Sequence, residues 1–138
     1  AEAIVSSDER DEKEVDKLQE AYGKGATGRG MTTGGAKAVK ELEKEQKSRA
    51  TRMVRDSIDG ALLDLVTFYR DVMVVQSGAT EPMINSDIRT EIERYASISP
   101  AHTAVQKMGA IMEARSQLAI NAAPLVTCEA LMCELARK

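Results

Sequence analysis

Glycines at the spacing of a phosphate-binding loop are the first residues in the chain whose pattern suggests chemistry. Gly23, Gly25 and Gly28 satisfy the spacing G-x-G-x-x-G within GKGATGRGMTTGG, residues 23–35. In dinucleotide-binding folds this motif follows a strand and opens a helix whose N-terminus holds the pyrophosphate. Here a polar helical pattern precedes the glycines, and no strand is predicted nearby. We therefore interpret residues 23–35 as a flexible linker, because glycine loses the most backbone entropy when it is ordered.

The residue types that most often form catalytic or metal sites are few and far apart. His102 is the only histidine in the chain, and Cys128 and Cys133 are its two cysteines. Five residues apart on a helix, the two thiols point to different faces, which disfavours both a disulfide and a shared metal ion. We therefore predict no catalytic residue, no metal site and no cofactor. A small nucleotide-binding protein built on the glycines is the alternative from the enzyme class.

A run of basic residues, KSRATRMVR at 47–55, is the most prominent charge feature. Arg52 and Arg55 share a helix face because they are three residues apart. The plain interpretation is a solvated helix face, and the alternative is contact with an acidic partner or a nucleic-acid backbone. The net charge of −3 gives the whole chain no basic surface for non-specific DNA binding. The candidate contact residues in this run are Lys47, Arg49, Arg52 and Arg55.

Arg70 and Asp71 place two charges in the middle of the most apolar helical pattern of the chain. Charged residues rarely lie in a core unless they are paired. We therefore expect these two residues to mark the strip of their helix that faces solvent. A polar contact with a neighbouring molecule is the alternative interpretation of the same pattern.

Helical patterns position all of these residues, and strand signals are nearly absent. The first predicted helix runs from Asp8 to about Tyr22, with Ser7 or Asp8 as its N-cap. It is acidic, because the first 22 residues carry eight acids and three bases. Its apolar stripe is thin, so it is marginal as an isolated helix.

A long helical pattern follows from about residue 36 to residue 76, and Gly78 is well placed to end it. The two parts of this pattern differ in composition. Residues 37–57 are mostly charged and indicate an exposed stalk. Residues 58–76 are apolar around most of the helix, which indicates a central, buried position.

Three shorter helices are predicted after this long one. The first begins at Ser86 or Asp87. The second begins with Ser99 as its N-cap and Pro100 as its first helical residue, where the fixed φ angle of proline suits a helix. Pro124 opens the last helix for the same reason.

The fold class that follows is all-α, with a helical bundle preceded by an acidic helix and a glycine-rich linker. We assign residues 1–35 to the acidic helix and linker, and residues 36–138 to the helical domain. Within that domain, residues 36–57 form the charged stalk and residues 58–138 form the core of the bundle. With 138 residues, of which 43% are apolar and 30% charged, the chain suits one globular domain with its own core.

Composition also bears on where the chain works. No apolar run approaches the roughly 20 residues that a membrane-spanning helix needs. Two cysteines without a disulfide framework fit a reducing compartment. We therefore expect a cytoplasmic protein without a membrane contact.

The stretch KSRATRMVRDSIDGALLDLVTFYRDVMVVQSGA, residues 47–79, resembles a known family. Together with SISP before a helix and Pro124-Leu125 near the end, it is similar to the C-terminal region of the delta-prime subunit of bacterial DNA polymerase III, a component of the sliding-clamp loader. The resemblance covers about residues 47–138. The family tends to have Asn where this chain has Ala123, so the last helix lacks a side-chain N-cap.

The resemblance implies a collar domain, a small helical domain that joins the loader subunits into a ring. It implies a non-catalytic assembly function in DNA replication, with the ATP-binding parts lying upstream of such a domain. The implied partners are other clamp-loader subunits, delta and gamma/tau, with DNA reached only through the assembly. Weak self-association of the isolated chain is a further expectation. The alternative function is a helical module that contacts nucleic acid through residues 47–55.

Such a collar domain is expected to bind its neighbours through helix faces that are too apolar for a monomer. The helix at 58–76 and the last helix are the two candidates, with charged residues setting the register of the contact. The candidate interface residues are Arg70, Asp71, Arg115, Leu125, Met132 and Leu135.

Overall fold

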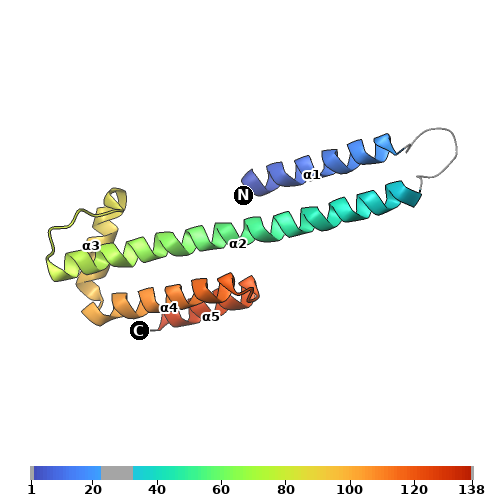
Figure 1. The fold of residues 1–138 in the computed structure, drawn as a ribbon. Helices are drawn as coiled ribbons and strands as arrows, with labels where there is room; N and C mark the ends of the chain where they lie inside the picture. The colour runs from blue at the N-terminus through green and yellow to red at the C-terminus, as the bar shows by residue number, and fades with distance from the viewer. Residues whose placement is uncertain (1, 23–32, 138) are drawn as a thin grey trace. The chain divides into compact units, whose positions relative to one another are not determined.

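The computed structural model describes residues 2–22 and 33–137, and Figure 1 shows that most of these residues lie in helices. None of these described residues lies in a strand, and the all-α prediction is confirmed. The elements are α1 (Glu2–Ala21), α2 (Thr33–Ser77), the short 3-10 helix η1 (Ser86–Ile88), α3 (Arg89–Ile98), α4 (Ala101–Ala119) and α5 (Pro124–Ala136).

The chain divides into two compact units, Ala1–Val54 and Arg55–Lys138. Helix α2 contributes residues to both of them. The predicted glycine-rich linker at 23–35 lies outside the described residues except for its last three, which belong to the first turn of α2. The prediction that these residues form a flexible linker and not a phosphate-binding loop therefore stays a prediction.

The first unit contains α1 and the beginning of α2. Helix α1 starts at Glu2 and not at Asp8. Ser7 and Asp8 consequently lie inside the helix, and the prediction that one of them caps it is wrong. The preceding residues contain neither proline nor glycine, so nothing in their backbone chemistry stops the helix from extending.

A narrow seam joins the two helices of the first unit. Val39 and Gln46, seven residues apart on α2, share one helix face and are both buried. The Nε2 amide of Gln46 donates a hydrogen bond of 2.8 Å to the backbone carbonyl oxygen of Asp11 on α1. The seam therefore combines an apolar contact with a buried polar one.

Helix α2 ends in a Schellman motif at Gly78, as the sequence predicts. Gly78 has a φ angle of 64°, in the left-handed region that glycine adopts without steric cost. Its N–H donates to the carbonyl oxygen of Val75 at 3.2 Å, and the N–H of Ala79 donates to that of Val74 at 3.1 Å. These two bonds satisfy carbonyl groups that the end of a helix otherwise leaves free.

Helix α4 ends in the same motif, with Asn121 in the left-handed position at a φ angle of 69°. The N–H of Asn121 donates to the carbonyl oxygen of Leu118 at 3.1 Å, and the N–H of Ala122 donates to that of Gln117 at 3.0 Å. Asparagine tolerates this conformation better than other residues with a Cβ atom. The side chain of Asn121 is thereby fixed at the end of α4.

Ser99 closes α3 instead of starting α4. Its backbone N–H donates to the carbonyl oxygen of Tyr95 at 3.1 Å, and its hydroxyl donates to the same oxygen at 2.8 Å. Pro100 is the N-cap residue of α4 and makes no side-chain cap. The predicted N-cap role of Ser99 is therefore wrong, because the preceding helix uses its hydroxyl.

Helix α5 begins at Pro124, as predicted. Its N-cap residue is Ala123, and no side-chain cap forms there. The sequence predicts this missing cap, because the chain has Ala123 where the family tends to have Asn. Proline at the first helical position partly compensates, since it needs no hydrogen-bond acceptor.

The core of the second unit lies where its four helices meet. Helix α4 runs antiparallel to the adjoining part of α2, and α5 returns along α4 (Figure 1). On α4 the buried residues recur at positions 104, 111, 114 and 118, which is the spacing of one helix face. The buried core cluster consists of Leu62, Tyr69, Val72, Ile92, Ala104, Ile111, Ala114, Leu118 and Leu131.

Three aromatic rings connect α3 to α2. Phe68 and Tyr69 on α2 and Tyr95 on α3 pack edge to face, with ring centroids 5.2 to 5.9 Å apart. This geometry is the favourable one for aromatic pairs. Lys107 on α4 adds a hydrogen bond of 3.0 Å from its Nζ atom to the Tyr95 hydroxyl. One aromatic cluster thus holds three helices.

Gln76 fixes the junction between α3 and α4 against the end of α2. Its Nε2 atom donates to the carbonyl oxygens of Ala96 at 3.1 Å and Ser99 at 2.9 Å. The third contact of the same amide, at 3.2 Å, is with the Ser99 hydroxyl. All three acceptors belong to the chain segment that changes direction between the helices.

Asp71 is fully buried, with an exposed fraction of 0%. Its carboxylate accepts hydrogen bonds from the backbone N–H of Ile84 at 3.1 Å and of Asn85 at 2.7 Å, and from the Asn85 side chain at 2.9 Å. Arg70 donates to it at 2.7 Å and to the carbonyl oxygen of Pro82 at the same distance. The expectation that Asp71 faces solvent is wrong, because the loop after α2 folds over it.

We predict that Asp71→Ala destabilises the second unit by about 3 kcal/mol, because it leaves buried backbone N–H groups and Arg70 without their acceptor. The measurement is the free energy of unfolding in urea. Asp64→Ala, which removes an exposed carboxylate from the same helix, is the matched control and is expected to change stability by less than about 0.5 kcal/mol. Equal effects of the two substitutions would contradict the prediction.

The same carboxylate predicts a pH dependence. Burial by itself raises the pKa of Asp71, but the donors from Asn85, Arg70 and Ile84 outweigh it and lower the pKa from 3.8 to about 2. A lowered pKa in the folded state stabilises the fold above the unfolded pKa, so this contribution is complete above pH ~4 and is lost as the pH falls to ~2.

Asp71→Asn removes the titration while keeping the shape of the side chain. We expect the difference in unfolding free energy between the natural chain and this variant to shrink by roughly 2 kcal/mol across that pH window. Urea unfolding at a series of pH values measures it. A difference that stays constant with pH would show that the carboxylate is not held ionised by these donors.

Candidate functional site

The four candidate residues of the basic run are divided between the two compact units. Lys47, Arg49 and Arg52 belong to the first unit, whereas Arg55 belongs to the second. Lys47 and Arg52 are exposed, and Arg52 has a polar contact of 3.5 Å with the Ser48 hydroxyl. The other two arginines are engaged by the chain itself.

Arg49 is held by the acidic helix α1. Its Nη2 atom lies 3.1 Å from an oxygen of Asp11 and 2.6 Å from an oxygen of Glu14. The hydrogen bond from Arg49 lowers the pKa of the Glu14 carboxyl. These groups are partly exposed, so the pairing contributes little stability. It does place two carboxylates where a nucleic-acid phosphate would otherwise bind.

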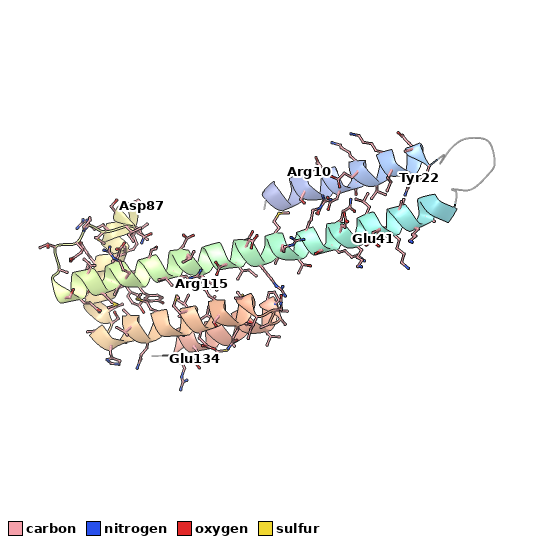
Figure 2. All side chains as sticks on the ribbon, in the orientation of Figure 1. Arg10, Tyr22, Glu41, Asp87, Arg115 and Glu134 are labelled. Atoms are coloured by element: carbon pink, nitrogen blue, oxygen red, sulfur yellow. The ribbon has the colours of Figure 1, made fainter. Side chains whose placement is uncertain are left out.

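Arg115 on α4 points toward α2 (Figure 2). There it forms an ion pair with Asp59. Its Nε donates to one carboxylate oxygen at 2.6 Å, and its Nη2 donates to the other at 3.0 Å. The hydrogen bonds from Arg115 lower the pKa of the Asp59 carboxyl. This two-point pairing fixes α4 against α2. A role of Arg115 at a subunit interface stays a prediction.

Arg55 lies further along the same boundary between α2 and α4. Its Nη1 atom donates a hydrogen bond to the side-chain oxygen of Asn121, the residue that ends α4. Its Nε atom is buried and has no hydrogen-bond partner among the described residues.

These side chains line a groove of about 500 Å³ between α2 and α4, which we call the arginine groove. The groove combines two arginines, two aspartates, an exposed methionine and the amide that ends α4. Its lining includes Arg55, Asp56, Asp59, Met112, Arg115 and Asn121. Arg55 and Arg115 were predicted to have different roles, and no pattern in the sequence indicates that they line one groove.

The candidate residues Arg70 and Asp71 serve the interior of the second unit. Because Asp71 has no exposed surface, its carboxylate cannot touch a neighbouring molecule, and its place among the interface candidates is a mistake. Arg70 is half-buried and donates to Asp71 and Pro82. A further contact from Arg70 to a partner stays a prediction.

The last helix carries the most exposed of the apolar candidates. Leu125 is 71% exposed and Met132 is 54% exposed, and the two lie on one face because they are seven residues apart. Leu135 is instead partly buried against the core. Thr127 and Leu131 are the buried residues of this helix.

Val126, 62% exposed at the start of α5, and Ile120 just before the helix also lie open to solvent. Neither was among the candidates, since neither falls in a helical repeat that singles it out. We call Leu125, Val126 and Met132 together the α5 surface.

The described residues hold no cluster of three or more His, Cys, Asp or Glu side chains suited to a metal ion. Nor does any helix in the described ranges combine the length and the apolar character that crossing a membrane requires.

The sequence model of one protein family, described as DNA polymerase III, delta subunit, C terminal, matches residues 53–133. The match spans more than half of the chain and includes α3, α4, most of α5 and the part of α2 within the second unit. No curated protein and no solved structure matches the chain. The match confirms the clamp-loader part of the resemblance, but its description names the delta subunit and not delta-prime.

The pairing of Arg115 with Asp59 predicts a change in titration. In Arg115→Met the Asp59 carboxyl loses its two donors, and we expect its pKa to rise toward the ordinary range for aspartate. NMR titration of the side-chain carboxyl measures this pKa. Arg89→Met removes an arginine that pairs with Glu93 on α3 and is the control. An unchanged pKa of Asp59 in the first variant would contradict the pairing.

Proposed function

The chain belongs to the family of C-terminal domains of the DNA polymerase III delta subunit, and we propose that it is a non-catalytic assembly domain of a clamp loader in DNA replication. Its task in this proposal is to bind the corresponding helical domains of other loader subunits. Such a domain contributes binding surfaces and leaves the chemistry of ATP to other parts of the assembly.

The α5 surface is the observation that carries this proposal. Single exposed apolar side chains are ordinary on a protein surface. Leu125 and Met132 are different because they lie on one face of a short terminal helix, with Val126 beside the first of them. Covering such side chains contributes about 1.5–3 kcal/mol each. The flexible thioether of Met132 also adapts readily to the shape of a partner.

We propose the gamma/tau and delta subunits as the partners, which the sequence resemblance implied. The resemblance pointed to delta-prime, whereas the family description names delta. A contact with delta distinguishes the two assignments. A chain that acts as delta-prime binds delta as a separate subunit. A chain that acts as delta occupies the position of delta itself and does not need a separate delta subunit as its neighbour. The proposed setting for this assembly is the cytoplasm.

No observation favours the alternative of a nucleic-acid-binding module. Arg49 is occupied by Asp11 and Glu14, and Arg55 binds Asn121. Two of the four basic side chains therefore already have partners within the chain. DNA contact in the proposed function is indirect, through the assembly.

We predict that the full 138-residue chain forms a complex with the purified C-terminal region of gamma/tau, and that Leu125→Glu combined with Met132→Glu weakens this complex by more than tenfold. The reason is that two charges then replace the apolar contact. Sedimentation at tens of micromolar protein measures the complex and any self-association. The delta C-terminal region is titrated in parallel.

Ile98→Glu is the matched control, since Ile98 is also a large, exposed apolar residue but lies at the end of α3. It is expected to leave the complex intact. A chain that stays monomeric with both subunit regions would overturn the assembly function. Loss of the complex in the control as well as in the α5 variant would move the interface away from α5.

A further inference from the structure

A row of lysines lies on the part of α2 that belongs to the first unit. The intervals between them are three, four and three residues, which places all of them on one face of a helix. Because a helix rises by 1.5 Å per residue, the row extends over roughly 15 Å. We call it the lysine ridge, and it consists of Lys37, Lys40, Lys44 and Lys47.

The lysine ridge faces away from α1. Val39 and Gln46 are buried and mark the side of α2 along which α1 lies (Figure 1). With about 100° between successive residues of a helix, the four lysines fall on the opposite side. All four side chains are exposed. The ridge is therefore open to a partner without any rearrangement of the first unit.

Ion pairing within the chain leaves most of the ridge free. Lys44 lies 3.8 Å from Glu41, but the two side chains are 79% and 64% exposed, so this pair is weak. The other three lysines form no ion pair among the described residues. Glu41 and Glu43 border the ridge on its two sides, and Glu45 lies further round the helix. The carboxylates thus flank the row without interrupting it.

The net charge of the chain conceals this surface, because it averages over all helix faces. Residues 1–22 carry eight acidic and three basic side chains, whereas residues 33–54 carry three acidic and six basic ones. Much of the negative charge therefore lies on α1, on the other side of α2 from the ridge. A helix is about 10–12 Å across, and exposed charges more than about 8 Å apart are largely screened at physiological salt. Helix α1 consequently does not cancel the ridge.

A nucleic-acid backbone matches the ridge better than an acidic protein helix does. Duplex DNA carries one negative charge for every ~1.7 Å of its axis, whereas carboxylates four residues apart on a helix recur only every ~6 Å. Lysine binds phosphate as a point charge on a flexible stem, so the contact needs no fixed geometry. Release of counterions from the DNA drives such binding, and a protein surface has no comparable layer of condensed ions.

We propose that the lysine ridge binds the phosphate backbone of DNA without reading its sequence. This contact differs from the alternative function through residues 47–55, because it lies on another face of α2 and uses none of the arginines of that run. It adds a weak direct contact to the indirect one of the assembly function. The inference rests on that function only in the choice of DNA as the polyanion, since an assembly for DNA replication works beside DNA.

The first test measures binding of the full 138-residue chain to a labelled DNA duplex by fluorescence anisotropy at 50 and 150 mM salt. Four phosphate contacts predict that affinity falls about 50-fold between these concentrations. Lys40→Gln combined with Lys44→Gln removes two contacts and keeps good helix formers. We expect this variant to bind roughly fivefold or more weakly at 50 mM salt, and its salt effect to shrink to about sevenfold.

Lys13→Gln combined with Lys17→Gln is the matched control. It removes two exposed lysines of α1 and changes the net charge by the same amount. We expect it to alter the affinity for the duplex by less than about twofold. Equal weakening by the two double variants would show that only overall charge matters, and it would overturn the proposal. A natural chain that does not bind the duplex at 50 mM salt would overturn it as well.

Glu41→Gln tests the ridge in the opposite direction. It removes the carboxylate beside Lys44 and should tighten binding to the duplex about two- to fivefold at 50 mM salt. Glu12→Gln removes an exposed carboxylate of α1 and is expected to leave the affinity unchanged. An equal gain in both variants, or no gain with Glu41→Gln, would contradict a contact at the ridge.

An acidic peptide separates the two classes of polyanion. Labelled poly-glutamate is titrated under the same conditions and is expected to bind at least about tenfold more weakly than the duplex. Equal or tighter binding of the peptide would assign the ridge to an acidic protein and overturn the DNA contact. These measurements include no other loader subunit, so a failed DNA contact leaves the assembly function standing. A chain that binds DNA through the ridge but binds no subunit region would overturn the assembly function alone.

Discussion

The burial of one carboxylate is the constraint on which the arrangement of the second unit depends. Asp71 is tolerated in the core as a carboxylate because hydrogen-bond donors surround it. The backbone of Ile84 and Asn85 supplies two of these donors, so the loop after α2 has to fold back over the helix. This return places α3 where Tyr95 reaches the rings of Phe68 and Tyr69. Helices α4 and α5 follow α3 in the chain, so their course depends on where α3 lies.

Local chemistry explains why much of the fold could be predicted from the sequence. Gly78 and Pro124 end and begin helices through their own backbone preferences, which need no knowledge of distant residues. The apolar repeat of 58–76 likewise places Leu62, Tyr69 and Val72 on a buried face. The family resemblance added the clamp loader, but it pointed to the delta-prime subunit where the family description names delta.

The rest could not be predicted because it depends on contacts between distant residues. Asp71 has the sequence environment of an exposed charge, and only the loop that covers it makes it a core residue. Ser99 and Pro100 match a start signal, but Tyr95 of the preceding helix takes the serine hydroxyl. The groove joins Arg55 to Asn121 across 66 residues, and no repeat in the sequence encodes such a pairing.

That separation along the chain has a consequence for the order of folding. Helices α3 and α4 can form early from local contacts, whereas bringing Arg55 to Asn121 and Asp59 to Arg115 closes long loops and costs more chain entropy. The groove is therefore complete only when α4 has docked on α2 along its whole length. A nascent or partly unfolded chain does not present it. Any contact that depends on this groove is therefore open only to a chain whose second unit has folded completely.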